Sequence, residues 1–298
     1  SVLAVFDING DAKEALSAGE EGVVVLDRTP FYAESGGQAG DYGQLVIDNN
    51  IFVVKDTQVS GDQRLHIGIM SADSASSFSV GNAISASVNS VSRRKTQANH
   101  SATHLMHAAL RSVLGDHVQQ KGSLVNNEKL RFDFSHTGPV TAEQLHEIED
   151  LVNEQILLNS PVTTELLSFD DAVERGAMAL FGEKYGDEVR VLSMGGSYSV
   201  ELCGGTHVSR TGDIGLFKIQ LESGIAAGIR RIEAVSGEGA LAVVSENDNL
   251  IASIGHTLKV GVSEINSRII QILAENKALS REVEQLGQKI AASKSSDL

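Results

Sequence analysis

The first 90 residues alternate between short apolar runs rich in β-branched side chains and polar breaks rich in Gly, Asp and Asn. Three of the apolar runs have the length and composition of strands: 23–26, 44–47 and 51–54. The polar segment 48–50 between the last two is typical of a hairpin turn. The pattern predicts a small antiparallel β-barrel or curled sheet. The glycine-rich segment 34–41 is either a tight corner turn or a loop whose backbone approaches a ligand.

Beyond residue 90 the apolar positions take up helical spacing. A helix is expected over 97–114, with Gly115 as its C-terminal stop, and a second amphipathic helix from Thr141 to about residue 158. We also expect a short helix over 169–180. Four further runs have the character of strands: 129–134, 189–192, 198–202 and 214–221. Helices and strands mixed in this way predict an α+β fold.

A heptad repeat marks the last part of the chain. The apolar seam of a heptad repeat is formed by its first (a) and fourth (d) positions. Here position a is occupied by Ile269, Asn276, Val283 and Ile290, and position d by Ile265, Ile272, Leu279 and Leu286. The repeat predicts one long helix over about 264–292, in which Asn276 is the only polar seam residue. The seam pairs either with a preceding helix over 248–258, as a hairpin, or with another copy of the chain. We therefore expect three domains: 1–90, 91–240 and 241–298.

Charge is distributed unevenly over the 298 residues. The whole chain has a net charge of −15, whereas the window 91–131 has +5. This window is either a docking face for a polyanion or a solvated basic face. Four side chains in it are candidates for contacts with RNA: Arg93, Arg94, Lys121 and Arg131.

The chain has one cysteine, no apolar run long enough to cross a membrane, and no charged-then-apolar leader. We therefore expect a cytoplasmic protein without a membrane partner. Because Ser1 opens in the middle of a strand pattern, the chain is expected to be an excised fragment.

Two pairs of metal-ligating residue types have the same spacing. His100 and His104 stand four apart in the expected helix, so both imidazoles project from one face, and Cys203 and His207 stand four apart in a glycine-bearing turn. Three imidazoles and one thiolate suit Zn²⁺. His107 is a competing ligand by its spacing from His104, although a histidine facing the core or solvent explains it too. Alternatively, Cys203 is a nucleophile with a histidine base.

Residues 119–123, Gln-Gln-Lys-Gly-Ser, are expected to form a loop between a helix and a strand. Amide and cationic side chains beside a metal suit the recognition of an RNA end, with Gln120 meeting a carbonyl or hydroxyl group. A solvated turn explains the same composition.

Taken together, six separated motifs resemble the editing domain of alanyl-tRNA synthetases. They occur in that family's order and cover about residues 1–240: 29–38, 99–107, 119–123, 130–136, 176–187 and 203–207. Free-standing trans-editing proteins share some of these elements. The heptad helix resembles the start of the synthetase C-terminal region, and nothing in the chain resembles an ATP site. The resemblance therefore implies a synthetase fragment that does not aminoacylate.

The resemblance implies hydrolysis of tRNA(Ala) wrongly charged with Ser or Gly, with Zn²⁺ held by His100, His104, Cys203 and His207. Four protein ligands close the zinc shell, which favours an organising role over a directly catalytic one. His100, Cys203 and Gln120 are the expected catalytic residues, and Gln120 is expected to grip the substrate near its 3′ end.

Three other functions are compatible with the same sequence features. A free-standing trans-editing deacylase shares the motifs, a non-catalytic tRNA-binding module would use zinc structurally, and an assembly module would act through residues 264–292. The expected partners are tRNA(Ala), Ser-tRNA(Ala), Gly-tRNA(Ala) and a second copy of the chain.

Overall fold

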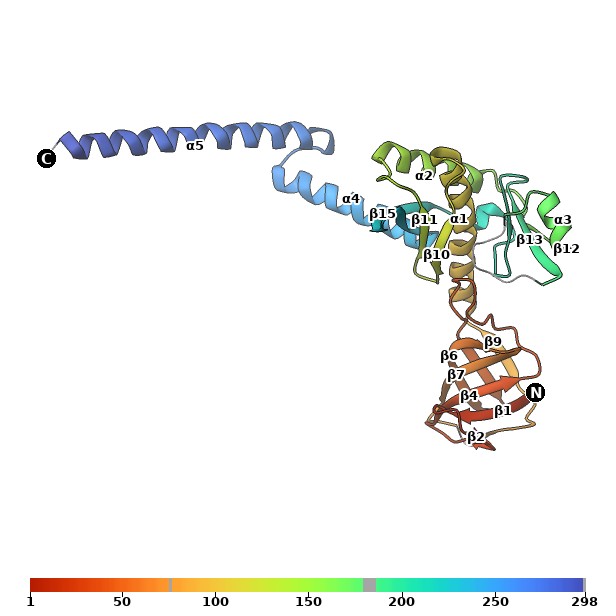
Figure 1. Cartoon of the computed structure of the whole chain (residues 1–298). Coiled ribbons are helices and arrows are strands. Elements are labelled where there is room, and N and C mark those ends of the chain that lie inside the picture. The colour runs from red at the N-terminus through yellow and green to blue at the C-terminus, as the bar shows by residue number, and fades with distance from the viewer. Residues whose placement is uncertain (75–76, 179–185, 297–298) are drawn as a thin grey trace. The chain divides into compact units, whose positions relative to one another are not determined.

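The computed structural model describes residues 1–74, 77–178 and 186–296. It has an α+β fold, as expected, and divides into two compact units, Ser1–Leu241 and Ala242–Leu298 (Figure 1). No helix in the described part of the chain combines the length and the apolar character needed to cross a membrane.

The N-terminal part is an antiparallel seven-stranded sheet in the order β2-β1-β4-β7-β6-β5-β9. Its strands are β1 (Val2–Asp7), β2 (Ala12–Lys13), β4 (Glu21–Leu26), β5 (Gly43–Ile47), β6 (Asn50–Ser60), β7 (Gln63–Met70) and β9 (Ser85–Val88). Two short strands, β3 (Ala15–Leu16) and β8 (Phe78–Ser79), pair beside it. Within the described residues β2 and β9 are the sheet edges, so of the two expected forms this is the curled sheet and not a closed barrel.

The three expected strands of this sheet are confirmed, and the turn at 48–50 joins β5 to β6. Asp48 adopts a positive φ of 48°, a conformation that a short polar side chain tolerates. Fully buried apolar side chains form the core of this region: Leu16, Leu45, Phe52, Met70 and Phe78.

Helix α1 (Ser90–Leu114) leads from this sheet into a second hydrophobic core. It begins seven residues before the expected start because the Asn89 side chain caps it, accepting a hydrogen bond from the Ser92 N–H at 3.0 Å. It ends at Gly115, as expected, where φ is 112°. Its middle section is buried almost all round, so its residues face several neighbouring elements at once.

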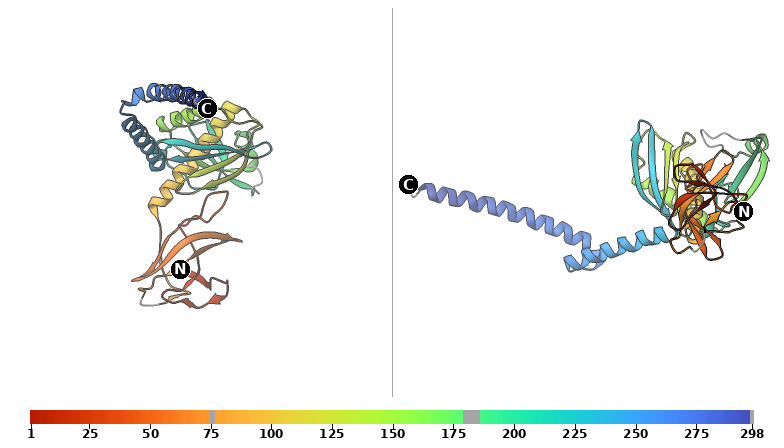
Figure 2. Two further views of the ribbon diagram at one scale, coloured as in Figure 1. Left: turned by 90° about the vertical axis from the view of Figure 1, so that its left-hand side faces the viewer. Right: turned by 90° about the horizontal axis from the view of Figure 1, so that it is seen from below.

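The second core lies between α1, helix α2 (Ala142–Leu157) and a four-stranded sheet (Figures 1 and 2). The sheet order is β10 (Gln120–Val125), β11 (Leu130–Ser135), β16 (Ile229–Ser236) and β15 (Phe217–Ala226). Helix α2 begins after Thr141, as expected, and Thr141 forms a capping box with Gln144. A third sheet contains β12 (Thr163–Ser168), β13 (Glu188–Met194) and β14 (Ser199–Leu202).

Three expected elements differ from the structure. Residues 120–123 belong to strand β10, not to a loop, because they pair with β11 across a bulge between Gln120 and Gly122. The helix expected over 169–180 is α3 (Phe169–Glu174), which stops before Gly176 at φ 78°; the end of that expected helix lies outside the described residues. Strand β15 starts at Phe217 because a 3₁₀ turn, η1 (Thr211–Ile214), occupies the residues before it.

The C-terminal unit is helical. Helix α4 (Glu238–Leu258) starts ten residues before the expected helix, and the turn η2 (Val262–Glu264) precedes α5 (Ile265–Ser296). Seam residues from Ile269 onward are exposed, from 36% at Ile272 to 68% at Val283. The long heptad helix is therefore observed, whereas the other described residues of this unit do not cover its seam as a hairpin would.

Candidate metal centre

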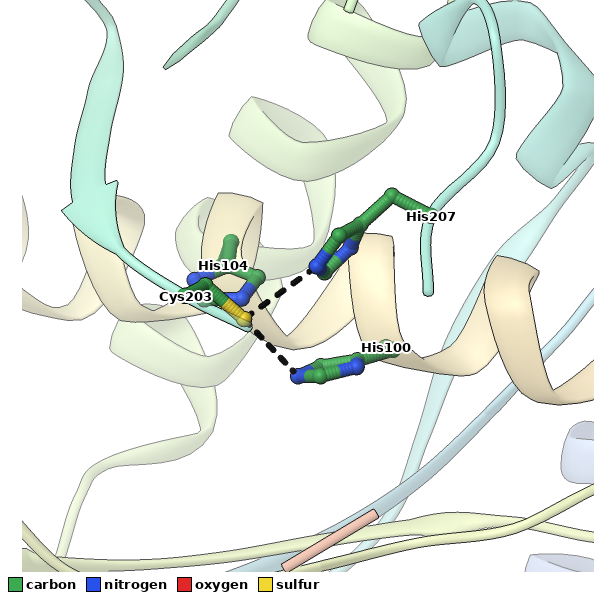
Figure 3. Close-up of side chains that lie close together, drawn as sticks. All are labelled: His100, His104, Cys203 and His207. Carbon is green, nitrogen blue, oxygen red and sulfur yellow. Dashed lines mark hydrogen bonds between the residues drawn. The ribbon is translucent and has the colours of Figure 1, made fainter. Parts of the chain in front are cut away.

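Four side chains from two distant segments meet in the Ser1–Leu241 unit (Figure 3). His100 and His104 project from one face of α1, and Cys203 and His207 lie on the segment that follows β14. Their ligand atoms all lie within 4.8 Å of one another. The thiol Sγ is 3.2 Å from His207 Nε2 and 3.7 Å from His100 Nε2. The spacing of four in each pair thus predicted a real convergence.

Each imidazole is oriented through its Nδ1 atom. His100 Nδ1 donates to the Gln38 side-chain oxygen at 2.8 Å, and His104 Nδ1 donates to Glu201 Oε2 at 2.8 Å. His207 Nδ1 lies 3.4 Å from the hydroxyl of a serine on α1, Ser101. Nε2 is therefore the nitrogen that each histidine has left for the centre of the cluster.

This arrangement fits a metal ion. His104 Nε2 is buried and has no hydrogen-bond partner in the described part of the chain, which costs free energy unless a ligand satisfies it. Histidines that ligate metals characteristically hold the other ring nitrogen in a hydrogen bond of the kind seen here. Three imidazoles and one thiolate match Zn²⁺ in donor type and number.

The electrostatics of the cluster favour a thiolate. Burial alone would raise the pKa of Cys203, but the positive charge on His104 and the hydrogen bonds with His100 and His207 lower that pKa to about 2. Burial would likewise lower the pKa of His104, yet the charges of Glu201 and Cys203 raise it to about 10. Burial and the neighbouring charge on His100 lower the pKa of His207 to about 3. The thiolate is the form of cysteine that binds metals.

His107 lies on the far side of Glu201. Its Nδ1 donates to Glu201 Oε1 at 3.0 Å, and its ring packs against Phe132 with a centroid separation of 5.1 Å. It does not belong to the cluster of four ligand atoms. Glu201, only 1% exposed, thus bridges two imidazoles, and the charges of both lower its pKa against the opposing effect of burial.

A cavity of about 680 Å³ opens beside the cluster. His100, His104 and Cys203 form part of its wall, and Thr103 of α1 adjoins them. The N-terminal sheet region supplies another part of the wall through residues between Pro30 and Gly36. The cluster is therefore accessible to a ligand that both regions contact.

The other expected site residues are divided between this cavity and the surface. Gln120, at the start of β10, and Arg93 line the cavity. Arg93 is committed to an ion pair, since its Nε donates to Asp41 Oδ1 at 2.9 Å and its Nη2 contacts the other carboxylate oxygen.

The remaining three cations are not among the lining residues of the cavity. Arg94 and Lys121 are exposed. Arg131 is half-buried on β11.

The sequence analysis did not identify the residues that hydrogen-bond to the imidazoles of the cluster. Glu201 could have been found, because an acidic residue inside an apolar strand, two positions before Cys203, needs a buried partner. Gln38 lies in the glycine-rich segment, for which a ligand-approaching loop was one interpretation, but nothing in the sequence indicates that its amide reaches α1. Ser101 has no signal beyond its neighbour His100.

Comparisons with known proteins identify the relatives of this chain. A family model for class II (A) tRNA synthetases matches residues 1–92, and one for the second additional domain of threonyl and alanyl tRNA synthetases matches residues 189–233. An alanine–tRNA ligase from Saccharophagus degradans is 54% identical over 293 residues, which are 98% of this chain and 33% of that protein.

Both family models describe regions of aminoacyl-tRNA synthetases, so residues 1–92 and 189–233 resemble proteins of that class. With the identity over almost its whole length, the chain belongs to the alanyl-tRNA synthetase family and includes the editing domain, as its motifs predicted. The chain spans about a third of the length of the relative that it matches.

Proposed function

We propose that this chain hydrolyses the ester bond of tRNA(Ala) mischarged with Ser or Gly, in a reaction that depends on zinc. The observation that carries the proposal is the buried cluster of three histidines and one cysteine in the wall of a cavity of about 680 Å³. The alanine–tRNA ligase relative supports alanine-specific tRNA as the partner.

Such a hydrolytic site compensates for the limited binding specificity of an activation site. A pocket built for the alanine methyl group discriminates against a side chain that differs by one small group by only about 1–3 kcal/mol. An activation site alone therefore mischarges tRNA with small amino acids, and a second site that removes them restores accuracy.

The roles of the residues follow from their positions. Zn²⁺ would be held by His100, His104, Cys203 and His207, where it would supply a fixed geometry, since four protein ligands close its shell. We assign catalytic roles to His100 and Cys203, which form part of the cavity wall. Gln120 lines the same cavity, and we assign its amide to gripping the substrate near its 3′ end.

The tRNA body is expected to meet the basic residues of 91–131. Arg94 and Lys121 are exposed and suit phosphate contacts, whereas Arg93 and Arg131 are less exposed. Because its substrate belongs to translation, we place the activity in the cytoplasm.

A single preparation tests the proposal. We expect about one zinc per purified chain and faster hydrolysis of Ser-tRNA(Ala) and Gly-tRNA(Ala) than of Ala-tRNA(Ala). Cys203→Ala should lower both zinc content and hydrolysis, while Ser209→Ala, at an exposed position nearby, should change neither. Zinc and tRNA binding without hydrolysis would instead identify a binding module. Loss of hydrolysis in Cys203→Ala with zinc fully retained would identify Cys203 as a nucleophile.

A further inference from the structure

The glycine-rich segment of the N-terminal region is joined to strand β10 by main-chain hydrogen bonds. The Val125 N–H donates to Gly37 O at 2.7 Å, and the Ala39 N–H donates to Val125 O at 2.9 Å. Gly37 has a φ of +85°, and a Cβ atom there would lie 2.7 Å from Ser123 O. Only glycine permits this approach. The two contacts on either side of Gln38 fix the direction in which its side chain leaves the loop.

That side chain ends between the two halves of the metal cluster. The Gln38 side-chain oxygen accepts hydrogen bonds from His100 Nδ1 at 2.8 Å and from the Thr206 N–H at 2.9 Å. Its Nε2 donates to the Thr206 hydroxyl at 2.9 Å. Gln38 is 0% exposed, so each of these bonds replaces one that water would otherwise make.

One buried amide thus touches both ligand-bearing segments. His100 belongs to α1, and Thr206 lies between the ligands Cys203 and His207. Gly205 keeps the contact open, because a Cβ there would lie 2.6 Å from His100 Nδ1 and 2.9 Å from the Gln38 oxygen.

We propose that Gln38 is a positioning residue for the metal: it holds the His100 ring and the segment 203–207 in the geometry that binds zinc. The proposal rests on the proposed function in so far as the cluster binds zinc. By accepting the Nδ1 proton of His100, the Gln38 oxygen keeps the Nε2 lone pair directed at the metal. The N-terminal region is then part of the metal centre.

The property of Gln38 that matters for the proposal is its acceptor oxygen. Two substitutions with side chains of similar length therefore distinguish loss of the acceptor from a change in packing. Gln38→Met removes the acceptor, and we expect about 10–100-fold weaker zinc binding. Gln38→Glu keeps acceptor oxygens toward His100 and the Thr206 N–H, and we expect zinc affinity within about threefold of the parent. Gln58→Ala, at an outlying glutamine of β6 that contacts Glu34 and Asp56, is the matched control and should change nothing.

The readouts are zinc affinity by chelator competition and the visible spectrum of the Co²⁺-substituted chain, with folding checked by circular dichroism. Gln38→Met should also shift the Co²⁺ bands because the ligand geometry relaxes. Equal zinc affinity and equal spectra for the parent and Gln38→Met would overturn the proposal. Equal losses in Gln38→Met and Gln38→Glu would overturn it as well, since packing would then explain the effect.

If Gln38→Met fails to fold, Thr206→Val decides. It removes the hydroxyl that accepts from Gln38 Nε2, so the side chain that holds the oxygen against His100 is less firmly fixed, and we expect about three- to tenfold weaker zinc binding; unchanged affinity would overturn the proposal. These measurements require no hydrolysis. A parent that binds zinc but does not deacylate Ser-tRNA(Ala) would refute the proposed function alone, whereas a parent that binds no zinc would refute both.

Discussion

The carboxylate of Glu201 lies 2.8 Å from Nδ1 of His104, and both residues are less than 5% exposed. Burying this pair is costly unless the carboxylate is fully hydrogen-bonded, and its second oxygen is in fact bound to His107. Carboxylate and imidazole together form the outer support that metal-binding histidines usually have. The strand that carries Glu201 ends one residue before Cys203, so a single short segment supplies both a ligand and the support of another ligand.

Removing this support should weaken metal binding. In Glu201→Ala, His104 and His107 each lose a buried acceptor, and we expect about 10–100-fold lower zinc affinity and about 1–3 kcal/mol lower stability. Chelator competition and thermal unfolding with and without zinc measure the two effects. Glu233→Ala, which removes a half-buried carboxylate bound to Lys129, is the control and should leave zinc affinity unchanged. Parental zinc affinity in Glu201→Ala would show that His104 needs no outer partner.

Binding of tRNA should depend on the exposed cations. We expect Arg94→Glu and Lys121→Glu to weaken tRNA binding and to reduce the slope of log affinity against log salt by about 0.9 for each duplex phosphate that the variant no longer neutralises. Filter binding at several salt concentrations measures this. Arg93→Glu should instead lower the melting temperature, because it places a carboxylate against Asp41. Unchanged affinity and slope in both surface variants would show that neither cation contacts the tRNA.

Acid should destabilise the N-terminal sheet through His66. Burial lowers its pKa, against the opposing effect of a hydrogen bond between Nδ1 and Val24 O at 2.9 Å. Below about pH 6.5, His66 takes up a proton more readily in the unfolded chain than in the folded chain. The free energy of unfolding is therefore retained above that pH and falls as the pH drops below it. Urea unfolding followed from pH 7.5 to 5 should show this loss.

A matched variant isolates the contribution of His66. His66→Gln keeps polar atoms toward Val24 and Thr29, and we expect it to flatten the pH dependence while lowering stability at pH 7.5. The same pH slope in the parent and in His66→Gln would assign the acid sensitivity to another group.

The sequence predicted what depends on local spacing. The sequence singled out the four candidate ligands because the spacing of His100 and His104 places both on one helix face, and because the pair Cys203 and His207 supplies matching donors. The strands of the first sheet and the capping box at Thr141 follow from short-range rules as well. These features are encoded within a few residues of one another.

What the sequence did not predict depends on pairs far apart in the chain. Gln38 and His100 are 62 residues apart, and only the docking of the glycine-rich segment on β10 brings them together. Residues 120–123 have loop-like composition but become a strand because β11 offers a pairing edge. Tertiary pairing determines both outcomes.

The exposed seam of α5 should associate with a second copy of the chain and contribute little to hydrolysis. Deleting residues 264–298 should lower the number of copies per assembly found by sedimentation, while zinc content and Ser-tRNA(Ala) hydrolysis at saturating tRNA stay unchanged. Loss of hydrolysis with zinc retained would show that the helix belongs to the catalytic unit.

Asn276 tests how the seam selects its partner. It occupies an a position between Ile269 and Val283, where a single polar residue fixes register and copy number at a cost in stability. Asn276→Leu should therefore maintain or raise the thermal stability of the helix while broadening the distribution of oligomers seen by sedimentation. Lys277→Leu, one position outside the seam, is the control and should leave the distribution unchanged. If the parent and Asn276→Leu are both monomeric at all concentrations, the seam does not mediate self-association, because a heptad interface with its polar residue removed would otherwise dimerise more readily.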